Sequence, residues 1–262
     1  MTDLLPIIMC AIFFLFLGAE GVFPARPQTL VKRWIGKGLL FFVISFLIGG
    51  LLPELWIPWF AAHRLFDLSG LGVGLGSLVA LLVGELIAYV WHRFQHNSAF
   101  VWRWTHQMHH SAERVDAAGA FYFHPLDSAI YALLSSASGA LLGVSAEAAA
   151  IAGLITFSMA IFQHSNIRTP HWFGYLVQRP EGHAIHHQRG VHGFNYGNIA
   201  LFDQLFGTFR NPRRYADELA GFWDGASSEI VPMLLGRDVG TPRSARTSQP
   251  APRSSRLSVA EL

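Results

Sequence analysis

Apolar stretches long enough to cross a lipid bilayer constrain this chain more than any other feature. A spanning helix needs about 20 mostly apolar residues, because each residue rises about 1.5 Å and the hydrocarbon layer is roughly 30 Å thick. Three such stretches lie at about Leu4–Phe23, Leu39–Ile57 and Leu71–Trp91. A fourth, Ser128–Gln163, is too long for one span and is interrupted near Gly143, which predicts a helical hairpin that either spans or re-enters. We therefore expect an all-α, multi-span integral membrane protein.

The composition agrees with a lipid environment and limits the kinds of site. Only 14% of the 262 residues are charged and 52% are hydrophobic, whereas soluble domains carry roughly 25% charged residues. A formal net charge of +2 gives no indication of a nucleic-acid partner. The single cysteine, Cys10, excludes an intramolecular disulfide and Cys-ligated zinc or iron–sulfur sites. Any metal must therefore use other ligands, and the chain has 13 histidines.

The distribution of basic residues predicts which side of the membrane the loops face. With the spans above, all of the 19 Lys and Arg residues except Arg64 fall on one side, which the positive-inside rule assigns to the cytoplasm. The first apolar stretch lacks a preceding basic residue and a small-x-small cleavage site, so we interpret it as a retained helix rather than a signal peptide. We expect a bacterial inner membrane, with the endoplasmic reticulum as the alternative.

Three histidine clusters carry the chemical information. On a helix, residues three and four apart share a face, so each cluster presents two or three imidazoles together. All three fall on the predicted cytoplasmic side. A structural zinc takes four ligands and a catalytic zinc three plus water, so eight imidazoles predict two neighbouring metal ions, for which iron, zinc and copper are all compatible. The clusters are His92 and His96; His106, His109 and His110; and His183, His186 and His187.

These clusters, in this order, resemble the histidine boxes of the membrane-bound fatty acid hydroxylase superfamily, which includes sterol desaturases, alkylglycerol monooxygenase and carotenoid hydroxylases. The surrounding motifs strengthen the resemblance, which covers about residues 70–212: Phe123-His124-Pro125, His164-Ser165-Asn166, Asn195-Tyr196-Gly197 and Leu205-Phe206-Gly207-Thr208. The resemblance implies an enzyme with two non-haem iron ions and O2 as co-substrate, acting on a C–H bond of a sterol, acyl or alkyl lipid. It also implies a separate electron donor, since the chain has no flavin motif, haem-binding domain or cysteine cluster.

The resemblance further implies a role for individual residues. The eight box histidines are expected to be metal ligands, and His164 is the next candidate. His124 and His192 are either further ligands or residues that orient their loops. Glu85 either hydrogen-bonds a ligand histidine or makes a helix–helix hydrogen bond. Asn195 either approaches the metals or only builds a turn.

The remaining candidates are assigned ordinary roles, and the chain divides into three parts. His63 and His171 are expected to be interfacial residues, and Trp102 and Trp104 members of the aromatic belt. The parts are a two-span membrane region at 1–69, a fatty acid hydroxylase-like catalytic domain at 70–236, and a disordered tail at 237–262, which is rich in Ser, Pro and Arg.

We expect hydroxylation as the reaction, with desaturation on the same site as the alternative. Both begin with hydrogen removal, and the motifs do not separate them. A metal carrier that uses the same histidines is the non-enzymatic alternative, although transporter sites generally lie near the bilayer midplane whereas these clusters lie at helix ends.

Overall fold

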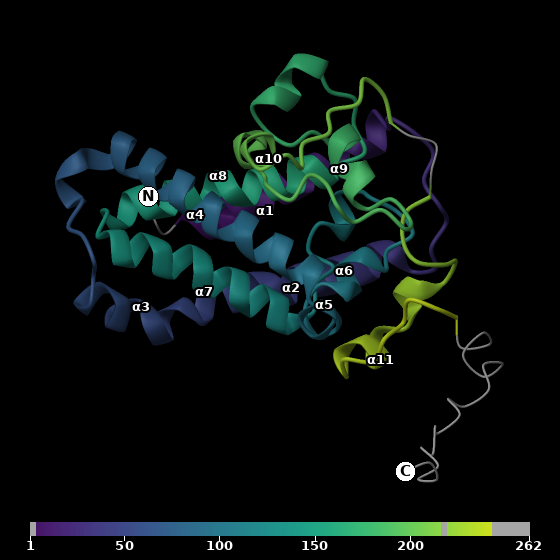
Figure 1. The fold of residues 1–262 in the computed structure, drawn as a ribbon, viewed down its shortest axis with the longest axis horizontal. Coiled ribbons are helices and arrows are strands. Elements are labelled where there is room, and N and C mark those ends of the chain that lie inside the picture. Colours follow the sequence, from purple (N-terminus) through teal and green to yellow (C-terminus); the bar gives the residue numbers. More distant parts are fainter. Residues whose placement is uncertain (1–3, 216–218, 243–262) are drawn as a thin grey trace, which may run out of the picture.

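Five long helices run side by side along the long axis of the molecule, and shorter helices gather at one end (Figure 1). The computed structural model describes residues 4–215 and 219–242. Within those residues no β-strand is present, and the only β-type pairings are two isolated bridges. The all-α fold predicted from the sequence is therefore confirmed. The long helices are α1 (Leu5–Val22), α2 (Trp34–Leu51), α4 (Gly72–Asn97), α7 (Pro125–Leu142) and α8 (Ala146–His164).

The short helices build a cap on the bundle, together with the loops between them. Those between residues 93 and 127 form where the chain is rich in Trp, His and Arg, as expected for segments at a membrane interface. Outside the cap, α3 (Pro53–Ala62) continues from α2 beyond a proline, and η2 (Ser69–Leu71) precedes α4. The helices of the cap are α5 (Ala99–Trp104), α6 (Gln107–His110), η3 (Ala117–Gly119), η4 (His171–Tyr175), α9 (Pro180–His186), α10 (Ala200–Leu205), η5 (Ala226–Ser228) and α11 (Ile230–Leu234).

Four helical stretches of the described chain are long and apolar enough to cross a membrane. They are Leu5–Val22, Trp34–Ala62, Ser69–Asn97 and Ala146–His164. The first three correspond to the first three predicted spans, and the fourth is the second half of the predicted hairpin. Its first half, α7, is not among the four. The second and third stretches extend beyond the predicted spans at both ends, whereas the first is shorter than predicted by one residue at each end.

The hairpin turn lies where the sequence predicted it. Helix α7 ends at Gly143, which adopts a left-handed conformation with φ of 64°. A Cβ atom there would lie 2.4 Å from the carbonyl oxygen of Phe66, so the position requires glycine. Ser145 then caps α8 by accepting a hydrogen bond from the Ala148 amide at 3.2 Å. The long apolar region is therefore two helices, as expected.

The N-terminal helices pack into the same body as the histidine-bearing segments. Glu20 on α1 accepts hydrogen bonds from the amides of Ala117 and Asn166, at 2.9 and 3.0 Å. At the start of α2, the indole of Trp34 donates to Asp116 at 2.8 Å. Helices from both sides of the predicted domain boundary at residue 69 therefore contact the same cap.

The C-terminal segment is packed beyond the residue at which we expected a tail to begin. Val239 is fully buried in the core beside Met108. Gln107 on α6 donates to the carbonyl oxygen of Arg237 at 2.8 Å, and Trp223 donates to that of Val239 at 2.9 Å. Residues 237–239 therefore belong to the cap, whereas residues 243–262 of the predicted tail lie outside the described residues.

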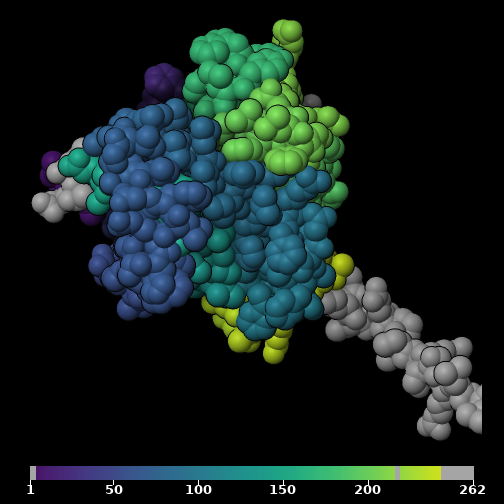
Figure 2. Space-filling view, turned by 60° about the vertical axis from the view of Figure 1, so that its left-hand side comes forward, coloured from purple at the N-terminus to yellow at the C-terminus, as the bar shows by residue number. Residues whose placement is uncertain are grey.

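The cap also folds over the side of the bundle. Figure 2 shows the segment around α10, in light green, lying against the blue surface of α4. The aromatic ring of Tyr89 on α4 stacks on that of Phe206, with centroids 5.2 Å apart, and lies 6.2 Å from that of Phe202. This contact brings the loop that follows α9 alongside the histidine-bearing end of α4.

Candidate metal centre

Nine histidines converge at the cap end of the bundle in two adjacent groups. Within each group, one ligand atom from every residue lies within 4.8 Å of all the others. The nine are the eight residues of the three sequence clusters and His164. The first group is His92, His96, His106, His110 and His186; the second is His109, His164, His183 and His187.

Helix geometry explains how the histidines of three short clusters are divided between two groups. His92 and His96 lie one turn apart near the end of α4, and both join the first group. Neighbouring residues on a helix point about 100° apart, so the two members of a histidine doublet face different directions. His109 and His110 accordingly join different groups, and so do His186 and His187.

The second group has the spacing expected of ligands around one metal ion. The Nε2 atom of His164 lies 2.9 Å from that of His109 and 3.0 Å from that of His183, whose Nε2 lies 3.1 Å from that of His187. Two imidazole nitrogens bound to one ion at about 2.0–2.1 Å lie about 3 Å apart. The arrangement therefore fits a shared metal ion.

Unpaired imidazole nitrogens in the first group point to a metal in the same way. Buried polar atoms in native proteins nearly always have a partner, so a cluster of exceptions needs an explanation. Among the residues that the structure describes, all five histidines of this group have at least one buried ring nitrogen with no hydrogen-bond partner. These atoms are Nε2 of His92, His106 and His186 and both ring nitrogens of His96 and His110. The two groups thus fit two metal ions.

Backbone carbonyls hold several of these rings with Nε2 turned inward. Nδ1 of His92 donates to the Tyr196 carbonyl at 2.6 Å, and Nδ1 of His186 donates to that of Phe194 at 2.8 Å. In α8, Nδ1 of His164 donates to a carbonyl one turn earlier at 2.6 Å. Because a carbonyl oxygen only accepts, Nδ1 carries the proton and Nε2 keeps its lone pair for a metal.

One ring is held by a carboxylate that the sequence analysis missed. Asp127, in the first turn of α7, is fully buried, and its Oδ2 accepts from Nδ1 of His106 at 2.9 Å. Its other oxygen accepts from Gln95 at 2.7 Å, and Gln95 accepts from Tyr131 at 3.1 Å. An acid directly before the apolar stretch Ser128–Gln163 was the available signal, since acids in or beside a membrane span are usually functional.

Burial favours the neutral form of six metal-site histidines in the cap. It lowers the pKa of the imidazoles well below the usual value, and the neighbouring imidazoles lower it further. This holds for His106, His109, His110, His183, His186 and His187. Neutral imidazole is the form that binds metal ions.

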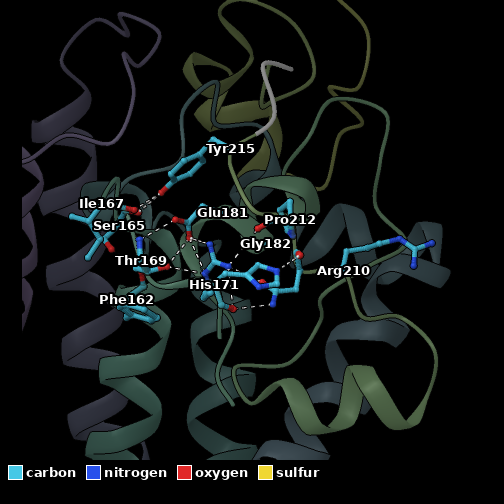
Figure 3. A network of polar contacts seen from close by, with 12 residues as sticks. Phe162, Ser165, Ile167, Thr169, His171, Glu181, Gly182, Arg210, Pro212 and Tyr215 are labelled. Carbon is cyan, nitrogen blue, oxygen red and sulfur yellow. Dashed lines mark hydrogen bonds and ion pairs between the residues drawn. The ribbon is translucent and has the colours of Figure 1, made fainter. Parts of the chain in front are cut away.

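A buried ion pair fixes the helix that carries the third cluster (Figure 3). Arg179 and Glu181, only 1% and 4% exposed, are joined by an Nη2–Oε2 distance of 2.9 Å at the start of α9. Glu181 also accepts from the amide and the hydroxyl of Thr169, at 2.9 and 2.7 Å, and Arg179 donates to Asn211 at 2.8 Å. The network ties α9 to the segment that follows His164.

Two other candidates lie outside both groups and have structural contacts. Asn195 has a positive φ of 59°, and its side-chain Nδ2 donates to the carbonyls of Gly182 and Arg210. It therefore builds the turn that holds α9. His124 caps α7 by accepting from the Leu126 amide at 3.0 Å.

Glu85 and His192 also lie outside the two groups. Glu85 accepts hydrogen bonds from Thr156 on α8 at 2.7 Å and from Asn198 at 3.1 Å, which is the helix–helix contact we considered for it. The ring of His192 is 5.1 Å from that of His110, close to the first group but not part of it.

The aromatic residues near the site differ in their surroundings. Trp102, which we assigned to the aromatic belt, lies instead against the first group, with its ring 4.9 Å from His96 and 5.1 Å from His110. Trp104 packs against Gly236, where a Cβ atom would meet its indole. His63 stacks on Trp59 at the far end of the bundle, away from both groups.

The two histidine groups lie within a recognised family domain. Residues 77–208, which contain all nine histidines of the two groups, match the family model described as fatty acid hydroxylase. The chain belongs to the fatty acid hydroxylase family. The resemblance inferred from the histidine boxes is thereby confirmed.

Curated relatives align with about half of the chain. It is 30% identical over 142 residues to an ornithine lipid hydroxylase of Rhizobium tropici, which covers 52% of this chain and 42% of the relative. It is 27% identical over 139 residues to a very-long-chain aldehyde decarbonylase of Oryza sativa subsp. indica, and 26% identical over 140 residues to sphinganine C4-monooxygenase 1 of Arabidopsis thaliana. Each of these alignments covers 50% of this chain and 53% of the relative. The chain spans about half the length of the curated relatives it matches, and no solved structure matches it.

Proposed function

We propose that this protein is a membrane di-iron oxygenase that hydroxylates an unactivated C–H bond of a lipid, with O2 and electrons from a separate donor. The observation that carries the proposal is the convergence of nine imidazoles in two adjacent groups at the end of an apolar cavity. Two of the relatives described above are named as hydroxylating or oxygenating lipids, which supports this reaction class.

The cavity supplies the place for the lipid. It has a volume of about 450 Å³, within the range of roughly 300–1,000 Å³ typical of ligand sites, and mostly apolar side chains line it. Imidazoles from both groups form its cap end: His92, His106, His109, His164 and His183. A carbon held at the cap end of this cavity would lie next to both proposed iron ions.

Side chains and backbone carbonyls of the protein orient the metal ligands, while the metal supplies the redox chemistry. When bound, the two iron ions supply O2 activation and the removal of hydrogen from an unactivated carbon. The Tyr196 and Phe194 carbonyls and Asp127 fix the ring orientations of His92, His186 and His106, so the ligand atoms are arranged before a metal binds. The burial of these rings excludes water from the reaction site.

The proposed membrane location gives the lipid one route to the site and the electrons and protons another. We propose that the histidine end faces the cytoplasm of a bacterial inner membrane, because nearly all basic residues lie on that side of the predicted spans. The lipid then reaches the cavity from the bilayer, whereas electrons and protons reach the site from water. The electrons come from a separate reductase or redox carrier.

Metal content and lipid products test the proposal together. Protein purified from membranes and loaded with Fe(II) without oxygen is expected to hold about two iron ions, the number that its two histidine groups accommodate. His109→Ala, which removes a member of the second group, should lose iron and product while still inserting into the membrane. His63→Ala, far from both groups, is the matched control and should keep both.

The products distinguish the competing reactions. Mass spectrometry of lipids from cells with and without the protein should show the gain of one oxygen atom. Loss of two hydrogen atoms would instead establish desaturation. An unchanged lipid profile with altered cellular iron or zinc would contradict the oxygenase and favour the metal carrier.

A further inference from the structure

Two buried oxygen atoms in the wall of the cavity lack a hydrogen-bond partner. They are Oε2 of Glu85 on α4 and Oε1 of Gln163 on α8, and both residues line the cavity. Glu85 and Gln163 are only 1% and 7% exposed. Among the described residues that line the cavity, no other buried side-chain oxygen is left without a partner. Buried polar atoms nearly always have one, so this pair needs an explanation.

The hydrogen bonds around these two atoms show why they are open. Thr156 and Asn198 both donate to the other oxygen of Glu85, at 2.7 and 3.1 Å. With its side-chain nitrogen turned to Glu85, Asn198 presents its side-chain oxygen to Gln163, whose nitrogen donates to it at 2.8 Å. The carboxyl of Glu85 thus sets the orientation of both amides. The result is one chain of hydrogen bonds that leaves two acceptors open and no donor.

The two open oxygens belong to neighbouring groups. The Glu85 carboxyl and the Gln163 amide each share a hydrogen bond with the same Asn198 side chain. A single polar group of a bound molecule suits both oxygens if it supplies at least two donors. A hydroxyl group has one donor, whereas a primary ammonium group has three. The number of open acceptors therefore favours an ammonium group.

The charge of the carboxyl favours the same group. Among the described residues, Glu85 takes part in none of the ion pairs. It is also outside both histidine groups, so neither proposed iron ion serves as its partner. Buried carboxylates are usually paired with a cation or bound to a metal, because an isolated buried charge is costly. A cation carried by a ligand would supply the missing partner.

We infer that Glu85 and Gln163 form a subsite that binds the primary ammonium group of an amino lipid. Glu85 lies seven residues before His92 on α4, about 10 Å along the helix, and Gln163 directly precedes His164 on α8. The bound ammonium group would hold the lipid so that a carbon a short, fixed distance from the nitrogen is oxidised. The inference rests on the proposed function for that reaction, but ammonium binding is measurable without turnover.

Matched photoprobes measure binding to the subsite. The full chain, as purified from membranes, is placed in lipid nanodiscs without O2 or reductant. Hexadecylamine and hexadecanol, each with a diazirine in the middle of the chain, differ only in their polar end. Labelled residues are mapped by peptide mass spectrometry, and the amine should label residues of the cavity wall on α4 and α8. Absence of saturable cavity labelling by the amine would overturn the inference.

Variants of the two acceptors test their roles. Glu85→Gln keeps the shape and removes the charge, so it should raise the half-saturating concentration of the amine roughly 10–100-fold, because a hydrogen bond to a charged group is lost. The alcohol should be affected much less. Gln163→Leu should weaken amine binding to a smaller extent, and it provides the test if Glu85→Gln does not fold. Glu54→Gln is the matched control, because Glu54 is an exposed acid of α3 that does not line the cavity.

Two further readouts exclude a merely structural role for the carboxyl. Glu85→Gln should keep the wild-type iron content, because the hydrogen bonds of Glu85 go to Thr156 and Asn198 and not to a histidine. Adding Gln163→Glu to this variant returns a carboxylate to the subsite and should restore part of the amine affinity. Equal losses for amine and alcohol, unchanged amine binding in both single variants, or loss of iron from Glu85→Gln would refute the assignment.

Lipid analysis separates this inference from the proposed function. In cells, the lipids oxygenated by the wild-type protein should carry a primary amine, and Glu85→Gln should lower their yield. If no lipid is oxygenated but the photoprobes behave as expected, the proposed reaction fails and the ammonium subsite stands. If the oxygenated lipids lack a primary amine, the subsite fails and the proposed reaction stands.

Discussion

Removing the Glu181 carboxylate is the most informative perturbation of the buried Arg179–Glu181 network, which holds the helix of the third histidine cluster. Glu181→Ala would leave the Arg179 guanidinium, 1% exposed, without the carboxylate that now lies 2.9 Å away. It would also remove the acceptor for both the amide and the hydroxyl of Thr169. Breaking a buried pair by removing one partner costs about 3–5 kcal/mol, because the remaining charge is uncompensated.

That cost translates into a measurable change in thermal stability. About 1 kcal/mol shifts the Tm by roughly 2–4 °C in a chain of this size, so the expected decrease is on the order of 10 °C. Because Glu181 lies two residues before His183 on α9, the loss should also disorder the ligands of the third cluster. We therefore expect lower iron content as well as a lower Tm.

The assay compares Glu181→Ala with a variant at an exposed ion pair. Asp224 contacts Arg189 at 3.0 Å with its side chain 80% exposed, and such pairs contribute about 0–1 kcal/mol. Asp224→Asn should therefore leave the Tm and iron content nearly unchanged. Both proteins would be measured in the same detergent by thermal unfolding and elemental analysis.

A double variant tests whether the uncompensated charge of Arg179 causes the loss of stability. Replacing Arg179 and Glu181 together by Met and Leu removes both charges, which is often tolerated where removal of one is not. It should recover part of the stability lost in Glu181→Ala. If Glu181→Ala keeps the wild-type Tm and two iron ions, the network does not hold α9 and the reasoning is wrong.

Two further predictions address the site and the fold. Asp127→Asn should lower metal affinity roughly 10–100-fold, because the carboxylate orients the His106 ring; titration of apoprotein with Fe(II) measures this, and unchanged affinity would contradict the role. Gly38→Val should prevent stable packing of α2 on the cap, since a Cβ there would lie 2.3 Å from the Ala118 carbonyl oxygen; protein recovered in folded form, with a wild-type Tm, would contradict this close contact.

The local patterns in the sequence predicted the parts that depend on short-range geometry. Apolar stretches of about 20 residues predicted the long helices, and the break at Gly143 predicted the hairpin turn. The i, i+3 and i, i+4 spacings predicted that histidines such as His92 and His96 share a face. The structure adds that His92 and His96 meet histidines from two other segments, residues 106–110 and α9.

Features that depend on tertiary pairing were not predicted. Nothing near Asp127 in the chain indicates His106, because the contact joins two segments only after the hairpin has folded onto α6. The position of Trp102 was not predicted either. The composition of its segment resembled an interfacial aromatic belt, but its ring lies against His96 and His110. For His124 the sequence left two roles open, a ligand or a residue that orients its loop, and the structure shows this histidine, which precedes a proline, as a helix cap.

The histidine doublets link the two groups mechanically. His109 and His110 are adjacent on α6 but belong to different groups, and His186 and His187 are adjacent at the end of α9. A rotation of either short helix would therefore move ligands away from both proposed ions at once. Short helices have little stability of their own, so their orientation must come from tertiary contacts. For α9, the contacts of Glu181 and Asn195 supply them, which explains why a site built from so many ligands also needs so many buried hydrogen bonds around it.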